Sequence, residues 1–141
     1  MRKYFYALMV AVFATMSLAV TSCSKDDDGD TSGNIVGSWE VVEGLTVDMD
    51  CRQFEQFRED GSYYEVVVWG ASWGGIFDKP NYSVGTWQLN GNTLKISIKN
   101  ECTIKKLSAN ELVISENGVS MKCKRVSDEL VNGYIANGKR Y

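Results

Sequence analysis

The residues that could perform acid–base chemistry are few and widely spaced in this sequence. Histidine is missing altogether, which removes the usual general base and the most common metal ligand. The acidic side chains fall mainly in expected turns and on strand exteriors, and only Glu55 and Glu65 could face inward as a carboxylate pair. The sequence has no glycine-rich phosphate loop, no G-x-S-x-G and no C-x-x-C motif. We therefore expect no enzyme activity, no metal site and no cofactor.

Cys23 stands where an apolar run stops and an acidic run starts. The apolar run covers residues 5–20, which is short of the about 20 residues that a membrane-spanning helix needs. A basic head, an apolar middle and small residues before a cut site are typical of a secretory signal. The sequence VTSC at residues 20–23 resembles the lipobox of bacterial lipoproteins. This resemblance implies that residues 1–22 are a signal peptide and that Cys23 is lipidated; an ordinary signal peptide containing a cysteine is the alternative.

The segment after Cys23 cannot bury itself in a core. Residues 24–34 carry four aspartates, one lysine and no apolar side chain, so residues 23–34 should form a lipidated, solvated tether. The run from Ser24 to Asp28 resembles the acidic export signal of surface lipoproteins in one bacterial lineage. We therefore expect a protein anchored in the outer membrane and displayed on the cell surface. The alternative is a plain acidic spacer facing the periplasm.

Residues 35–141 are long enough for one domain with a single core. The formal net charge of the whole chain is only −3, and the tether accounts for much of it. A nearly balanced domain has no basic footprint for nucleic acid. The expected contacts are therefore the membrane, through the anchor, and an unknown small molecule or protein partner.

Turn signals divide this domain into short segments with strand character. Asp60-Gly61, Asn90-Gly91 and Asn117-Gly118 each separate two apolar runs and are typical of tight hairpins. The segment TLKISI alternates, with Leu94, Ile96 and Ile98 on one face. No segment has a sustained helical period. We therefore predict eight strands, at residues 35–43, 51–58, 62–69, 82–89, 93–98, 101–107, 111–115 and 119–126.

Consecutive hairpins predict an all-β fold that closes on itself as an eight-stranded up-and-down antiparallel barrel, because closure removes exposed strand edges. A two-sheet β-sandwich is the alternative. The tail from Ser127 should begin as a short helix capped by that serine and should cover one outer face.

Several motifs occur together in an order that resembles one known family. They are GSW at residues 37–39, F-x-x-D-G at 57–61, GTW at 85–87, N-x-L-x-I at 92–96, TIKKL at 103–107 and KCKRV at 122–126. This order resembles the bacterial lipocalin-like lipoprotein domains. In that resemblance, Gly37 to Trp39 match the G-x-W of the first strand, and Arg125 matches the arginine of the last strand that covers the tryptophan.

Strand directions predict a structural role for Trp39, Trp87 and Arg125. If the first strand runs upward, the fourth runs downward, so Trp39 and Trp87 lie at the same end and plug the barrel. Arg125 reaches that end from the last strand, where a cation–π contact would contribute about 0.5–2 kcal/mol.

The longest connection, GASWGGIFDKPNY, lies at the opposite, open end of the predicted barrel. It contains Trp73 and Phe77, with Trp69 just before them and Tyr82 near its end. We predict that these four residues bind a small apolar or saccharide ligand at the barrel mouth. Two alternatives remain: Trp73 and Phe77 fold inward as a lid, or the loop serves a protein-interaction module, an inhibitor or assembly component, with a filled barrel.

Three cysteines remain after Cys23, an odd number for an oxidising compartment. Cys51 and Cys102 begin two downward strands and so share the open rim, which makes their disulfide the expected one. Cys123 should then be free and buried. The alternative is that Cys51, Cys102 and Cys123 are all unpaired core residues.

Overall fold

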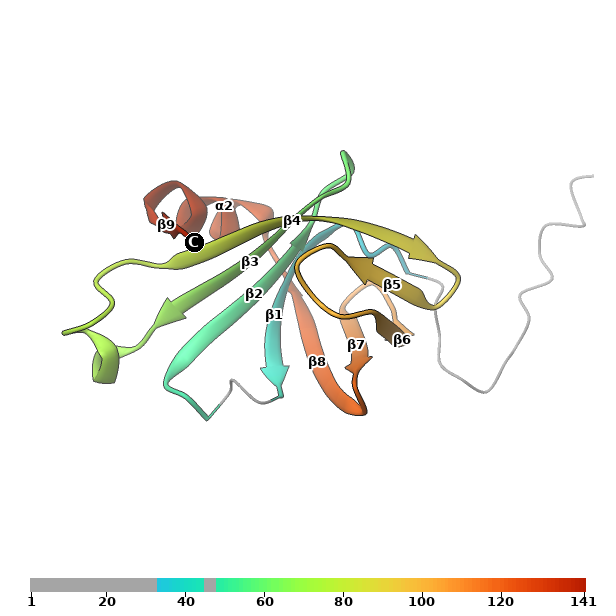
Figure 1. The fold of residues 1–141 in the computed structure, drawn as a ribbon, viewed down its shortest axis with the longest axis horizontal. Helices are drawn as coiled ribbons and strands as arrows, with labels where there is room; N and C mark the ends of the chain where they lie inside the picture. Colours follow the sequence, from blue (N-terminus) through green and yellow to red (C-terminus); the bar gives the residue numbers. More distant parts are fainter. Residues whose placement is uncertain (1–32, 45–47) are drawn as a thin grey trace, which may run out of the picture.

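The computed structural model describes residues 33–44 and 48–141 and consists mainly of strands (Figure 1). Residues 1–32, which include Cys23, the predicted signal peptide and most of the tether, lie outside the described part. The elements are β1 (Gly37–Glu43), β2 (Cys51–Phe57), β3 (Ser62–Trp69), η1 (Ala71–Trp73), β4 (Asn81–Asn90), β5 (Thr93–Ile96), β6 (Cys102–Leu107), β7 (Glu111–Glu116), β8 (Val119–Val126), α2 (Asp128–Asn137) and β9 (Lys139–Arg140).

Strands β1 to β8 form a closed up-and-down antiparallel barrel. Each strand pairs with the next along the chain, and β8 pairs with β1 to complete the ring. This confirms the predicted meander and excludes the sandwich. Tight turns drive the pairing: Asn117 and Gly118 both have positive φ, 51° and 81°, as the hairpin between β7 and β8 requires.

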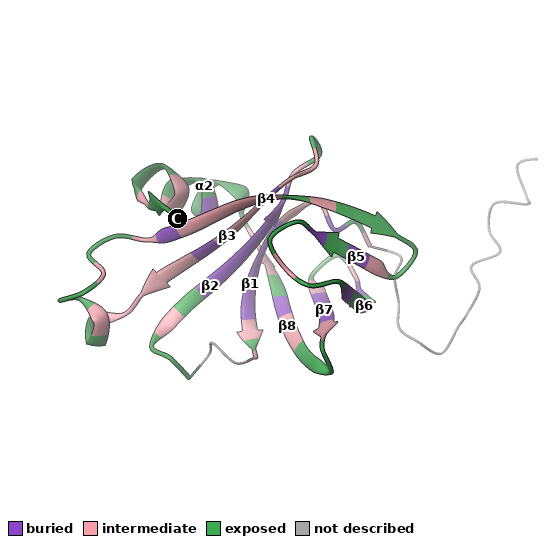
Figure 2. Ribbon diagram, in the orientation of Figure 1, coloured by how far each residue is buried: buried purple, intermediate pink, exposed green. Residues whose placement is uncertain are grey.

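The interior of the barrel holds the main core. Alternate residues of the strands point inward, and the largest fully buried side chains include Trp39, Tyr63 and Phe57. Figure 2 shows buried residues along β1, β2 and β3. Aliphatic side chains from β1 and from β5, β6 and β7 complete this core: Val41, Leu94, Ile96, Ile104, Leu107, Leu112 and Ile114.

Helix α2 lies across the outer face of β1, β2 and β3, as Figure 1 shows. The Ser127 side chain accepts a hydrogen bond from Leu130 N and caps the helix, as predicted. Val131 of the helix packs on Phe54 and Val66, which point outward from β2 and β3. The sequence did not predict β9, which pairs in parallel with β4 after the helix.

Strand β5 is shorter than predicted, because it ends at Ile96 rather than at residue 98. Lys99 N donates to Ile96 O, so the chain turns at this point, and Ile98 is 44% exposed instead of facing the core. Gly85 of β4 permits the turn, since a Cβ there would meet Ser97 Oγ at 2.7 Å. The turn directs the Lys99 side chain into the barrel.

Candidate functional site

One end of the barrel is closed by Trp39 and Arg125. The Trp39 ring is fully buried, and the Arg125 guanidinium carbon lies 4.0 Å from its centroid. Arg125 also donates to the backbone carbonyls of Val36, Asn34 and Ala109. Gly37 has φ of 127°, and a Cβ at this position would overlap Arg125. The G-x-W segment and Arg125 therefore form one structural unit.

Trp87 lies at the same end but is only half-buried. Its ring meets Phe57 edge to face, with centroids 5.7 Å apart, and its Nε1 donates to Arg58 O. Trp87 thus packs against the core from the side of β4, while Trp39 fills the centre.

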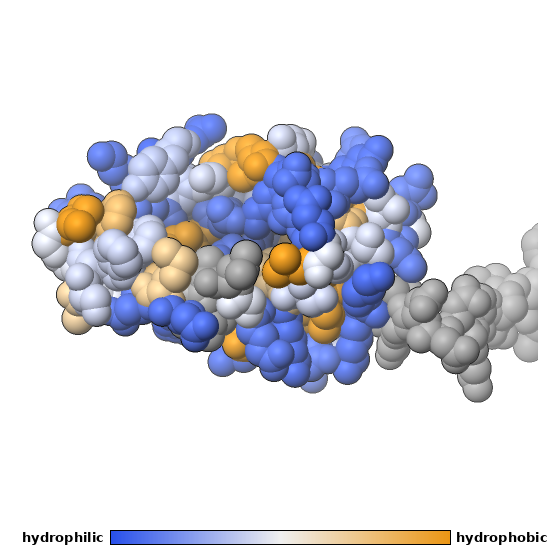
Figure 3. Space-filling model, turned by 60° about the horizontal axis from the view of Figure 1, so that its bottom comes forward, coloured by the Kyte–Doolittle hydropathy of each residue, from blue (hydrophilic) through white to orange (hydrophobic). Residues whose placement is uncertain are grey.

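The opposite end, the mouth, contains a cavity of about 290 Å³. Figure 3 turns the underside of Figure 1 forward and shows apolar side chains scattered among hydrophilic ones. The apolar wall comes from Cys102, Ile114, Val119 and Met121. Its polar lining comes from Gln53, Lys99, Glu116, Asn117 and Ser120. The volume lies near the lower limit of the ~300–1,000 Å³ typical of small-molecule sites.

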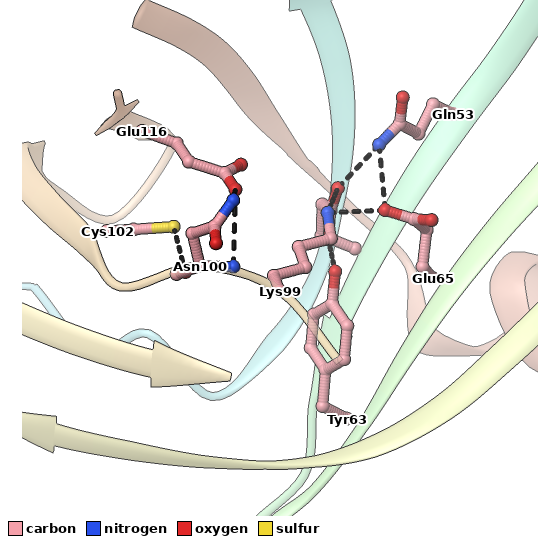
Figure 4. A network of polar contacts seen from close by, with 8 residues as sticks. Gln53, Tyr63, Glu65, Lys99, Asn100, Cys102 and Glu116 are labelled. Carbon is pink, nitrogen blue, oxygen red and sulfur yellow. Dashed lines mark hydrogen bonds and ion pairs between the residues drawn. The ribbon is translucent and has the colours of Figure 1, made fainter. Parts of the chain in front are cut away.

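Gln53 and Lys99 of the cavity lining belong to a largely buried network of polar side chains, which Figure 4 shows. Lys99 Nζ is 3.0 Å from Glu55 Oε1 and also forms an ion pair with Glu65. Gln53 Nε2 donates to Glu55 Oε1 at 2.8 Å and to Glu65 Oε2 at 3.2 Å. The Tyr63 hydroxyl donates to the other oxygen of Glu55. Glu55 and Glu65 therefore do face inward as a pair, and Lys99 lies between them.

Burial and neighbouring charge perturb the pKa values of this network. Burial raises the pKa of Glu55 to about 7, and the charge of Glu65 adds to this effect while Lys99 opposes it. Burial alone would lower the pKa of Lys99, but Glu55 and Glu65 outweigh it and raise that pKa. The ammonium of Lys99 therefore stays charged, and Glu55 changes its protonation near neutral pH.

Three of the four predicted aromatic ligand-binding residues come together at the mouth end. Trp69 and Phe77 stack with centroids 4.3 Å apart, and Trp73 lies 5.5 Å from Trp69. The Trp73 Nε1 donates to Met49 O, which ties this loop to the connection between β1 and β2. All three rings are half-buried.

Tyr82 does not belong to this cluster, and its prediction as a ligand-binding residue is wrong. It is paired with Val66, an outward-facing residue of β3, and its ring packs against Tyr64 at a centroid distance of 6.3 Å. The alternation of β4 sends the side chain of Tyr82 out of the barrel, toward helix α2.

The expected Cys51–Cys102 disulfide is absent, because Cys102 is a free thiol. Cys102 begins β6 and Cys51 begins β2, and three strands separate β2 from β6 by either route round the barrel. The two residues share a rim but lie on opposite walls, beyond the Cα reach of a disulfide. The thiol of Cys102 instead contacts Asn100 O. Cys123 is free and buried, as predicted.

In the part of the chain that the structure describes, no group of three or more His, Cys, Asp or Glu side chains could hold a metal ion. No helix in residues 33–44 or 48–141 is both long enough and apolar enough to cross a membrane.

A closed eight-stranded barrel with an internal cavity defines a class of ligand-binding-type folds that includes the lipocalins. Residues 35–114, from just before β1 into β7, match the family model described as the lipocalin-like domain. The match covers more than half of the chain, so the chain belongs to the lipocalin-like domain family. The comparison with curated proteins gives no match.

Proposed function

We propose that this protein is a binding module that holds a small, mainly apolar ligand in the mouth of its barrel. The observation that carries this proposal is the cavity of about 290 Å³, whose lining combines apolar walls with several polar groups. The apolar walls favour an apolar ligand over a saccharide, since they offer few hydrogen-bond partners to a ring of hydroxyl groups.

We propose a binding role rather than a catalytic one. Glu55 has the pKa that acid–base catalysis at neutral pH would need. Its two oxygens, however, are occupied by Lys99, Gln53 and Tyr63, and its side chain is fully buried. A substrate in the cavity would therefore meet Gln53 and Lys99 before it could reach Glu55.

For location, we propose a lipid anchor at Cys23 in the outer membrane, with the domain on the cell surface. The support is the lipobox-like sequence and the acidic tether in the printed sequence. Gly33 donates to Leu107 O and lies beside Ser108, at the closed end of the barrel. A tether that leaves from there would direct the mouth away from the anchoring membrane.

The test of ligand binding is isothermal titration calorimetry of the purified protein with octan-1-ol. Met121→Trp places a bulky indole ring in the cavity and should abolish saturable binding, because Met121 lines the cavity. Leu89→Trp is the matched control, since Leu89 lies outside the cavity lining on a hairpin at the closed end. Unfolding midpoints of both variants show whether each is folded. Unchanged binding by a folded Met121→Trp protein would contradict the proposal.

A second candidate, a protein-interaction module, is favoured by one observation. Ile76 is 72% exposed and Met49 is 44% exposed, and both adjoin the Trp69, Trp73 and Phe77 rings through the same loops. Apolar side chains exposed together in this way are typical of contact surfaces. Ile76→Ser would weaken the binding of a protein partner that contacts this loop but would leave octan-1-ol binding in the cavity unchanged.

A further inference from the structure

Gln53, a residue of the cavity lining, has a hydrogen-bond acceptor that no other described residue uses. This residue is only 8% exposed and lines the cavity. Its amide nitrogen donates to Glu55 and Glu65, and since a carboxylate can only accept, these two bonds fix the orientation of the amide. The amide oxygen is turned away from both carboxylates (Figure 4). It accepts no hydrogen bond from the described residues.

Lys99 is the one cationic side chain among the described residues that line the cavity, and its ammonium group is already paired. Lys99 Nζ donates to both oxygens of Glu55 and forms an ion pair with Glu65, so its ammonium hydrogens point into the network. An incoming anion would find no spare donor on Lys99. It would also lie close to two carboxylates, whose repulsion is strong where water is excluded.

Glu116 adds a third carboxylate at the cavity wall. Its Oε1 accepts from the backbone and side-chain nitrogens of Asn100, which hold it in place (Figure 4). Its second oxygen accepts no hydrogen bond from the described residues. Glu116 lines the cavity, while Glu55 and Glu65 lie behind Gln53 and Lys99. Among the described residues of the lining and the network, only Lys99 offsets these three carboxylates, and protonation of Glu55 reduces this negative balance without reversing it.

We propose that the ligand is an amphipathic amine, with an apolar body against Ile114 and Met121 and a positively charged, hydrogen-bond-donating head toward Gln53 and Glu116. The proposal rests on the proposed function, since it names the ligand class of the same cavity. An ammonium head can donate a charge-assisted hydrogen bond to the Glu116 oxygen that accepts none from the described residues, or to the amide oxygen of Gln53. A fatty-acid head carries the wrong charge, and a neutral alcohol offers one donor without charge.

The experiment compares three probes of equal chain length, octan-1-amine, octan-1-ol and octanoate, by calorimetric titration of the purified protein near pH 7. We expect the amine to bind about 10-fold more tightly than the alcohol, and octanoate to bind least. Glu116→Gln keeps the shape of the side chain and removes its charge, so it should weaken binding of the amine several-fold more than binding of the alcohol. Glu101→Gln is the control, because Glu101 is exposed and does not line the cavity.

The outcomes separate this proposal from the one on which it rests. If octan-1-ol binds and octan-1-amine binds no better, the amine class is wrong while the cavity remains a ligand site. Equal loss of amine and alcohol binding in Glu116→Gln would show a shape effect and would overturn the role of charge. If none of the three probes binds, both the ligand class and the proposed function fail.

Discussion

The ammonium nitrogen of Lys99 lies 3.0 Å from Oε1 of Glu55 inside the barrel, and Glu55 has no exposed side-chain surface. A buried carboxylate of this kind is costly unless a cation and hydrogen bonds compensate it. Lys99 reaches it from the turn after β5, whereas Glu55 lies on β2. The contact therefore joins two distant parts of the barrel wall, and its lysine also lines the cavity.

Removal of the Lys99 charge should destabilise the fold strongly. Lys99→Met leaves Glu55 and Glu65 facing each other without a cation, and breaking a buried pair in this way costs about 3–5 kcal/mol. Lys124→Met is the control, since Lys124 is largely exposed and its ion pair with Glu40 should contribute at most about 1 kcal/mol. Urea unfolding of both variants measures the difference. Equal, small effects would mean that Lys99 does not neutralise the network.

The stability of the protein should rise as the pH falls from 8 to 5. The folded-state pKa of Glu55 is raised to about 7, so between its unfolded value of 4.5 and 7 the folded state binds more protons than the unfolded state. Its contribution is complete below the unfolded pKa and is lost as the pH rises through about 7. The expected change between pH 8 and pH 5 is about 2 kcal/mol. With no histidine in the sequence, few other groups titrate in this window.

Glu55→Gln should abolish most of this pH dependence, because a glutamine does not titrate. Glu101→Gln is the matched control and should keep it, since Glu101 is exposed. Urea unfolding at pH 5, 6, 7 and 8 gives the measurement. A flat profile for the unmodified protein would mean that Glu55 is already ionised throughout this range.

The tryptophans should differ sharply in their effect on stability. Trp39→Ala removes a fully buried ring from the closed end and should cost about 3–5 kcal/mol. Trp87→Ala should cost less, about 1–3 kcal/mol, because Trp87 is half-buried at the edge of the core. Trp73→Ala should stay within about 1 kcal/mol of the unmodified protein. If urea unfolding shows that Trp73→Ala destabilises as much as Trp39→Ala, the loop is a structural lid.

The sequence predicted most of the fold because its turns are explicit. Asn-Gly and Asp-Gly pairs predicted the hairpins. Glu55 and Glu65 were the acidic residues that could face inward, as they do, but SYYEVVVW in β3 is apolar on both faces, so alternation alone did not orient that strand. The closed end was also predictable, since strand direction alone places Trp39 and Arg125 together. These features depend on local sequence and on connectivity.

The floor of the cavity was less predictable. If the strand continued through TLKISIK, alternation would place the Lys99 side chain on the exposed face. The turn after Ile96 sends it inward instead. The sequence did contain one indication of a nearby cation, because two buried carboxylates such as Glu55 and Glu65 need a positive charge beside them. The predicted Cys51–Cys102 disulfide was wrong because strand direction places both cysteines at the same rim but does not give the distance between them. In the barrel they lie on opposite walls.

The proposed lipid anchor predicts a change in location. Cys23→Ser should release the protein from the membrane fraction, because the acyl chains would have no attachment point. Cys51→Ser, within the domain, is the control and should remain in the membrane fraction. Protease treatment of intact cells then distinguishes surface display from a periplasmic position. A Cys23→Ser protein that stays with the membranes would exclude the anchor.

The most direct test of ligand binding inside the barrel is a nuclear magnetic resonance titration of the ¹⁵N-labelled protein with octan-1-ol, followed through the backbone amides. Binding in the cavity predicts saturable shifts at residues that line it, such as Gln53, Ile114 and Met121, and none at Gly91 at the opposite end. Shifts confined to Trp73 and Ile76 on the loop, or no saturable shifts at all, would contradict it.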